Sequence, residues 1–204
     1  MVRSCEDRNV PLFVNYMRRA DPGVIEIKNR IARGEIATPV KGVAWYSKGF
    51  FHNGSHFFNL LEYWLGSMQG ATVVDRGRRW DNVDPEPDAR VAFANGTISF
   101  LAAREEHFSH YTVELVTANG RLRYDDGGES IEWRPARPDP AFAGYFSLSV
   151  PESIASGMSR YQWHVADQLA AALAGRPYHL CTGTEALTTL TAMHEVLTNH
   201  DDRH

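Results

Sequence analysis

The chain has 204 residues, of which 43% are hydrophobic and 23% are charged, a composition typical of one globular domain. Its net charge of -4 offers no electrostatic attraction to nucleic acid or to an anionic membrane, so we expect neither as a partner. Cys5 and Cys181 are the two cysteines and form no CxxC pair, so we expect no disulfide framework. The sequence shows neither a long apolar run nor a signal peptide, which predicts a cytoplasmic protein.

Two elements are predicted near the N-terminus. Residues 10–19, VPLFVNYMRR, form a short apolar run that predicts a buried strand followed by two arginines. Asp21 then suits a helix N-cap and Gly34 a helix stop, with apolar residues recurring on one face between them. We therefore expect a helix over this interval.

A strand, a loop and a second helix are expected next. Residues 38–49 are rich in β-branched and aromatic side chains, which favour a strand. From Ser55 to Leu65, apolar residues cover more than half of a helical circumference, and Gly66 follows at the stop position. This helix is expected to be largely buried.

The middle of the chain carries two hairpin signals. Asn95-Gly96 and Asn119-Gly120 each lie between alternating apolar runs, and a further strand is expected after Gly127-Gly128. Successive hairpins build an antiparallel sheet. The acidic residues just before the first hairpin are interpreted as parts of solvated loops. They are Asp81, Asp84, Glu86 and Asp88.

Two helices are predicted after a Pro-rich passage at residues 135–151. The first covers about residues 156–174, and the second opens at Thr182, which stands three residues before Glu185 in the spacing of a capping box. Helices and a block of strands in this order indicate the α+β class. The last residues, NHDDRH, are interpreted as an exposed terminus.

Common catalytic motifs are absent from the sequence. It contains no GxGxxG, GxxxxGK[ST], GxSxG or HExxH pattern, which removes support for a dinucleotide fold, a P-loop, a serine hydrolase and a zincin. His52 and His56 stand four apart, but Gly54 between them argues against a continuous helix and no third ligand is near. We therefore expect no metal site.

The motifs taken together resemble a known family. VPLFVNYMRRADPGVIEIKNRIARGEI, NGSHFFNLLEYWLG, ANGRLRY and GTEALTTLTAMHEVL occur in this order. They are similar to the C-terminal domain of the Gfo/Idh/MocA oxidoreductases (glucose-fructose oxidoreductase, inositol dehydrogenase). The resemblance implies a large, mainly antiparallel open sheet with helices packed on one face. It implies that the other face is a dimer interface, hence a homodimer.

The resemblance also implies how the chain is organised. Residues 1–19 look like the remnant of the last helix and strand of a Rossmann domain, and residues 20–204 look like the substrate and oligomerisation domain. The dinucleotide fingerprint and the lysine of the family's Glu-Lys-Pro segment have no counterpart. We therefore expect a truncated or split oxidoreductase with no cofactor of its own, inactive alone. The full-length family implies NAD or NADP and a sugar, cyclitol or related polyol as substrate.

The resemblance assigns a catalytic role to His56, which matches a histidine beside the substrate that takes or returns the hydroxyl proton. A histidine in the first turn of a helix stays neutral because the macrodipole disfavours imidazolium. A capping or packed histidine is the structural alternative. Many members carry aspartates where this chain has His52 and Asn59, and an asparagine stabilises an imidazolium less than a carboxylate does.

Five further residues are candidates for substrate binding: Asn53, Arg18, Arg19, Tyr16 and His52. An arginine here would hold an anionic substrate group with two hydrogen bonds, although surface charges at a strand end are an equal alternative. Asn53 would donate to a sugar hydroxyl, and an asparagine before glycine is as often part of a turn.

Two other functions stay open at this point. One is a non-enzymatic partner or scaffold that dimerises through its exposed sheet face, because an uncovered apolar sheet associates. The other is a free-standing metal-dependent enzyme, which would require a bound metal in stoichiometric amount.

Overall fold

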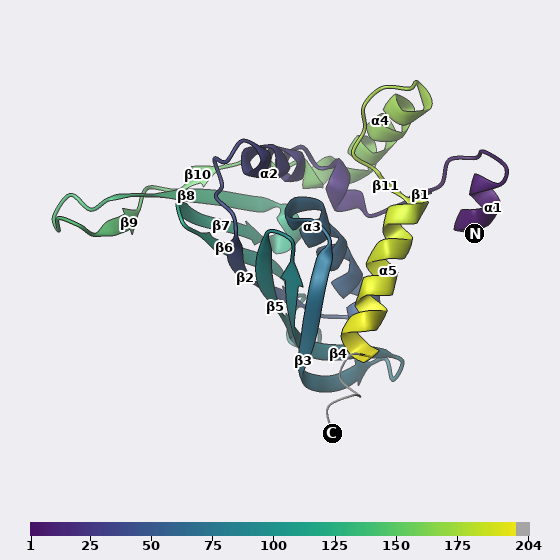
Figure 1. Ribbon diagram of the computed structural model, residues 1–204, viewed down its shortest axis with the longest axis horizontal. Coiled ribbons are helices and arrows are strands. Elements are labelled where there is room, and N and C mark those ends of the chain that lie inside the picture. The colour runs from purple at the N-terminus through teal and green to yellow at the C-terminus, as the bar shows by residue number, and fades with distance from the viewer. Residues whose placement is uncertain (199–204) are drawn as a thin grey trace.

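One large open sheet with helices on one of its faces makes up most of the protein (Figure 1). The structure is a computed structural model that describes residues 1–198, and the predicted exposed terminus at residues 199–204 lies outside the described part. The predicted α+β class is confirmed. Within residues 1–198, no helix has the length and apolarity required to cross a bilayer.

The main sheet contains nine strands in the order β10-β8-β7-β6-β2-β5-β4-β3, with β9 paired to β8 outside this path. β2 and β5 run parallel, and the other neighbours run antiparallel. A separate small sheet joins β1 to β11. The strands are β1 (Phe13–Val14), β2 (Val40–Tyr46), β3 (Met68–Trp80), β4 (Asp84–Phe93), β5 (Gly96–Ala102), β6 (Tyr111–Thr117), β7 (Gly120–Asp125), β8 (Ser130–Pro138), β9 (Phe146–Leu148), β10 (Glu152–Ser153) and β11 (Cys181–Thr182).

The core lies between the inner face of the sheet and helices α2, α3 and α5. Phe57, Phe58 and Leu61 of α3 and Ile98 and Phe100 of β5 are fully buried there. The helical elements are α1 (Val2–Glu6), η1 (Met17–Ala20), α2 (Pro22–Ala32), η2 (Gly49–Gly54), α3 (Ser55–Leu65), η3 (Asp126–Gly128), η4 (Met158–Arg160), α4 (Tyr161–Leu173) and α5 (Gly183–Thr198).

Side-chain capping explains where α2 and α5 begin, and it confirms the predicted starts of these two helices, whereas the helix predicted from about residue 156 begins at Tyr161 as α4. The Asp21 carboxylate accepts hydrogen bonds from the amides of Gly23 and Val24 at 2.8 and 3.1 Å. At α5, the Glu185 amide donates to the Thr182 hydroxyl, and the Thr182 amide donates to the Glu185 carboxylate at 2.8 Å. This reciprocal pair is the predicted capping box.

Both predicted hairpins are present, but each glycine lies one position later than an Asn-Gly turn would place it. The two-residue loops end at Asn95 and Asn119, and Gly96 and Gly120 are the first residues of β5 and β7. A Cβ on Gly120 would come within 2.5 Å of the Trp133 ring. The glycine is therefore required for close packing and not for the turn.

The prediction of a buried strand over residues 10–19 is wrong for most of that run. Only Phe13–Val14 pairs, with β11, and Met17–Ala20 forms a 3₁₀ turn. Arg18 and Arg19 are 6% and 5% exposed, so they are not surface charges at a strand end. Their burial depends on aromatic side chains distant in sequence, which a local pattern does not reveal.

The acidic residues before the first hairpin also differ from the prediction. Asp81 lies in an exposed turn, but Asp84, Glu86 and Asp88 belong to β4. Glu86 is 2% exposed and pairs with Arg78 at 2.8 Å, and the Asp88 carboxylate accepts the Ala102 amide. These carboxylates satisfy backbone and guanidinium donors that burial would otherwise leave unpaired.

Candidate functional site

A π-helical segment, η2, connects β2 to α3 and carries His52 and Asn53, while His56 follows in the first turn of α3. Lys48 adopts a left-handed conformation before it, and η2 continues directly into α3. The Asp84 carboxylate accepts hydrogen bonds from the amides of Phe51 and His52 at 3.0 and 2.8 Å. A carboxylate at the start of a helix is favoured by the unpaired amides there.

The expectation that Gly54 interrupts the helix between the two histidines is wrong, because η2 and α3 are continuous. The rings nevertheless have different neighbours. His52 is exposed and stacks on Trp80 with centroids 5.4 Å apart, whereas His56 meets the edge of Tyr16 at 5.3 Å. Among residues 1–198, no group of three or more His, Cys, Asp and Glu side chains is arranged to hold a metal.

His56 is a mostly buried, neutral histidine. Burial, together with the nearby charge of Arg18, lowers its pKa to about 4. Its Nδ1 atom is buried and has no hydrogen-bond partner. At neutral pH the ring can therefore accept a hydrogen bond or a proton from a group placed beside it.

Arg18 is a buried cation, and none of the ion pairs found among residues 1–198 includes it. Its guanidinium carbon lies 5.2 Å from the centroid of the Phe57 ring and 5.7 Å from that of Tyr111. Its Nε atom is buried and unpaired. The Tyr124 hydroxyl is a hydrogen-bond partner of the guanidinium, while the aromatic faces attract the cation without accepting a hydrogen bond, so the unpaired Nε–H is left for an anion or a hydroxyl.

Asn53 and Tyr111 complete the group around Arg18. The side-chain amide of Asn53 donates to the Tyr111 hydroxyl at 2.6 Å across two elements far apart in sequence. The amide is thus engaged in a tertiary contact, and turn chemistry does not account for it. We use the name Arg18 cluster for these contacting side chains. The cluster consists of Tyr16, Arg18, Asn53, His56 and Tyr111.

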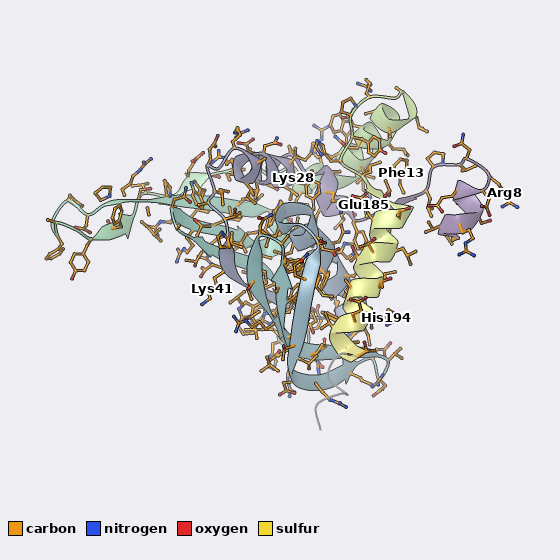
Figure 2. All side chains as sticks on the ribbon, viewed as in Figure 1. Arg8, Phe13, Lys28, Lys41, Glu185 and His194 are labelled. Atoms are coloured by element: carbon orange, nitrogen blue, oxygen red, sulfur yellow. The ribbon has the colours of Figure 1, made fainter. Side chains whose placement is uncertain are left out.

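Arg19 and Asn59, both discussed from the sequence, have other partners. Arg19 donates to Glu185 at 2.8 Å and lies over the Tyr63 ring, which ties η1 to the first turn of α5. Lys28 lies over the same ring at 3.7 Å, and Figure 2 shows Lys28 and Glu185 near the upper end of α5. Asn59 donates to Thr189 at 2.9 Å, not to His56.

Sequence reasoning missed Tyr111 as a member of the cluster. It is the first residue of β6, and its neighbours along the chain carry no motif. Only the sheet order, which puts β6 beside β2, brings its hydroxyl to Asn53.

The chain also has a cavity of about 410 Å³ between α1 and the start of α5, lined by residues such as Cys5, Leu12 and Thr184. That cavity shares no lining residue with the Arg18 cluster.

The turn between β2 and α3 does not fit a dinucleotide. A pyrophosphate needs free amides in a glycine-rich turn between a strand and a helix. The turn after β2 is of this kind, but its amides already donate to carboxylates: Gly49 to Glu86 at 3.0 Å, and Phe51 and His52 to Asp84. Two carboxylates at this point would repel a pyrophosphate.

Comparison with protein-family models gives no match, and comparison with curated protein sequences gives none either. Solved structures share the fold. An oxidoreductase from Agrobacterium radiobacter in complex with NAD+, L-tartaric acid and magnesium matches 98% of this chain and 66% of its own, with a TM-score of 0.63 and 17% identity. An NAD binding oxidoreductase from Klebsiella pneumoniae matches 99% and 67%, with a TM-score of 0.73 and 16% identity.

The WlbA dehydrogenase from Bordetella pertussis, in complex with NADH and UDP-GlcNAcA, matches 97% of this chain and 65% of its own, with a TM-score of 0.65 and 17% identity. The chain therefore spans about two thirds of the length of these structures. At this identity the likeness establishes the fold, which is one found in NAD(P)-binding oxidoreductases.

Proposed function

We propose that this chain is the substrate-binding and oligomerisation part of an NAD(P)-dependent oxidoreductase that acts on a sugar, a cyclitol or a related polyol. The observation that carries the proposal is the Arg18 cluster, in which a buried cation without a carboxylate partner lies beside a neutral histidine with a free ring nitrogen. Unpaired buried donors and acceptors are costly in a purely structural role, and they become satisfied when a polar ligand binds.

Each side chain of the cluster has a distinct role in this proposal. His56 accepts the proton of a substrate hydroxyl, since its ring is neutral at pH 7. Arg18 stabilises negative charge on the substrate oxygen or on a neighbouring anionic group. Asn53 and Tyr111 form a hydrogen-bonded pair that can orient a further hydroxyl.

In this proposal the dinucleotide is bound by protein outside residues 1–198, which is supported by the strand-to-helix turn after β2, where Asp84 and Glu86 already accept the backbone amides. When bound there, the nicotinamide would supply the hydride chemistry. The division into residues 1–19 and residues 20–204 remains a prediction that belongs to this proposal.

Calorimetric titration tests the proposal. The chain is titrated with neutral polyols, aldoses and sugar acids, and separately with NAD and NADP. At least one sugar-like compound is expected to bind saturably, with binding lost in Asn53→Ala and kept in the matched control Asn29→Ala on the exposed side of α2. Micromolar binding of NAD or NADP, or equal loss of sugar binding in both variants, would overturn it.

A second candidate function is a non-enzymatic partner that pairs through the outer face of the sheet. The observation that favours it is the exposure of Trp45 and Val116 on that face, where Lys41 pairs with Val116 across β2 and β6. Light scattering tests it, and a monomer at micromolar concentration would exclude it. Pairing is compatible with the oxidoreductase proposal, in which a second copy is also expected.

A further inference from the structure

The Arg18 cluster contains a positive charge that no other member of the cluster balances. Arg18 is charged, whereas the other members are two tyrosines, an asparagine and a histidine that burial keeps neutral. The side chain of Arg18 is only 6% exposed, and none of the ion pairs found among residues 1–198 includes it. A buried cation without a counter-ion is costly, so an anion bound beside it would stabilise this region.

The carboxylates near the cluster bind donors of their own. Glu62 accepts a threonine hydroxyl of α5 at 2.5 Å, and Asp21 accepts backbone amides at both of its oxygens. Glu105 pairs with Lys48 at 3.0 Å, on the side of Tyr111. Each of these carboxylates is therefore satisfied where it lies, and a counter-ion for the buried guanidinium would arrive with a ligand.

Two unused hydrogen-bond donors lie in the same place. The Arg18 Nε–H group has no partner, and the Tyr111 hydroxyl accepts the Asn53 amide at 2.6 Å, which leaves the hydroxyl proton to be donated. The guanidinium carbon of Arg18 lies 5.7 Å from the centroid of the Tyr111 ring, so both donors belong to one neighbourhood. An ionised carboxylate only accepts hydrogen bonds and can satisfy both donors, whereas a sugar hydroxyl brings a further proton.

The exposure of the individual members indicates how a ligand reaches Arg18. His56 and Tyr111 are partly exposed, whereas Arg18 and Asn53 are buried. A ligand that enters beside the two partly exposed rings therefore meets the guanidinium at the inner end of its path. There the low local dielectric makes a hydrogen bond between charged groups stronger than it is in water.

We propose that the substrate of this site is a sugar acid, an aldonate or a uronate, whose carboxylate is bound by Arg18 and the Tyr111 hydroxyl while a nearby hydroxyl group lies at His56. This assignment rests on the proposed function and names the class of substrate within it. The carboxylate supplies the counter-ion that the cluster lacks and accepts both unused hydrogen bonds. A neutral polyol in the same position leaves the charge of Arg18 unbalanced.

The size of the expected preference follows from the charge. An acid and its primary amide have the same carbon chain and the same hydroxyl groups, and they differ in the charge and in one acceptor that becomes a donor. Hydrogen bonds to a charged group contribute more than neutral ones, so the acid should bind on the order of tenfold to a hundredfold more tightly than the amide.

Calorimetric titration with matched acids and amides tests the assignment. Gluconate, galactonate, glucuronate and galacturonate are each compared with the corresponding amide. The proteins are the wild type, Arg18→Met, Arg18→Lys and the control Arg8→Met, which changes an exposed arginine that follows α1. Circular dichroism verifies that each is folded. At least one acid is expected to bind the wild type and the control more tightly than its amide does.

The Arg18 variants should change this preference in a graded way. Arg18→Met should bind the acid and the amide equally, because the cation is removed. Arg18→Lys should keep part of the preference, because it retains the charge but loses the planar guanidinium. If Arg18→Met does not fold, the wild-type comparison of acid with amide and the Arg18→Lys variant decide the outcome.

The outcomes separate the substrate class from the proposed function. If amides or neutral polyols bind as tightly as the acids, and Asn53→Ala abolishes this binding, the proposed function stands and the acid class is refuted. If both arginine-to-methionine variants lose the preference equally, or if Arg18→Met and Arg18→Lys keep all of it, the carboxylate is not bound by Arg18 and the assignment is refuted. If no polyol, acid or amide binds, the substrate class and the proposed function are both refuted.

Discussion

His56 makes the stability of this protein depend on pH in a way that one substitution removes. Its pKa is about 4 in the folded protein against an ordinary value near 6.5. Between these values the unfolded chain binds a proton that the folded protein does not. The free energy of unfolding therefore falls as pH decreases through 6.5, and this contribution reaches its limit below pH 4.

The expected size follows from the two pKa values. At pH 5, the preferential protonation of the unfolded chain costs about 2 kcal/mol relative to pH 8, and the full shift corresponds to roughly 3 kcal/mol. His56→Asn removes the titrating ring, so its stability should fall by about 2 kcal/mol less than that of the wild type over the same pH range. Asp21 and Glu62, whose pKa values burial raises, have the opposite dependence but occur in both proteins.

Urea denaturation at pH 8 and pH 5 provides the measurement. Tyr16→Phe is the matched control, because it keeps the ring that meets the edge of His56 and removes only a hydroxyl. The control should show the same pH dependence as the wild type. If the wild type and His56→Asn lose stability equally between pH 8 and pH 5, His56 is not the buried neutral group described here.

Three other substitutions test neighbouring parts of the account. Arg18→Met should raise the pKa of His56, measured from its ring resonances by NMR, and an unchanged pKa would contradict the electrostatic effect of Arg18 on His56. The same substitution should change the free energy of unfolding by less than about 1 kcal/mol, because the lost charge is buried without a carboxylate partner. Glu86→Gln should destabilise the protein by about 1–3 kcal/mol in urea, since it weakens the bonds to a backbone amide and to Arg78; no loss would refute that role. Thr182→Ala should lower the free energy of unfolding by about 1 kcal/mol in the same assay, because it removes the capping hydroxyl of α5. A loss smaller than that of a Thr→Ala substitution at an exposed position elsewhere on α5 would argue against this capping role.

The parts of the fold that the sequence predicts are those decided locally. Asp21, the Thr182–Glu185 pair and Gly66 define helix ends through bonds or dihedral angles within a few residues, and these ends agree with the structure. The two hairpins are also local, although the close approach of Trp133 to Gly120 shifts the role of the glycine.

The parts that the sequence does not predict depend on contacts between distant segments. Arg18 is buried because Phe57 and Tyr111 supply the rings around it, and neither is near it in sequence. Glu86 is buried because it receives the amide of Gly49, on another element. The candidate site is therefore only partly visible in the sequence: His56 and Asn53 stand in a recognisable motif, whereas their connection to Arg18 through Tyr111 requires the sheet order.

The most direct test of the proposed substrate site is an NMR titration that follows the His56 ring while a sugar-like ligand identified by calorimetry is added. The account predicts a saturable shift of the His56 ring and of the Asn53 side-chain amide, with the same dissociation constant as the calorimetric binding. A ligand that binds saturably and moves the resonances of Cys5 and Thr184 at the α1–α5 cavity, while those of His56 and Asn53 stay fixed, would contradict it.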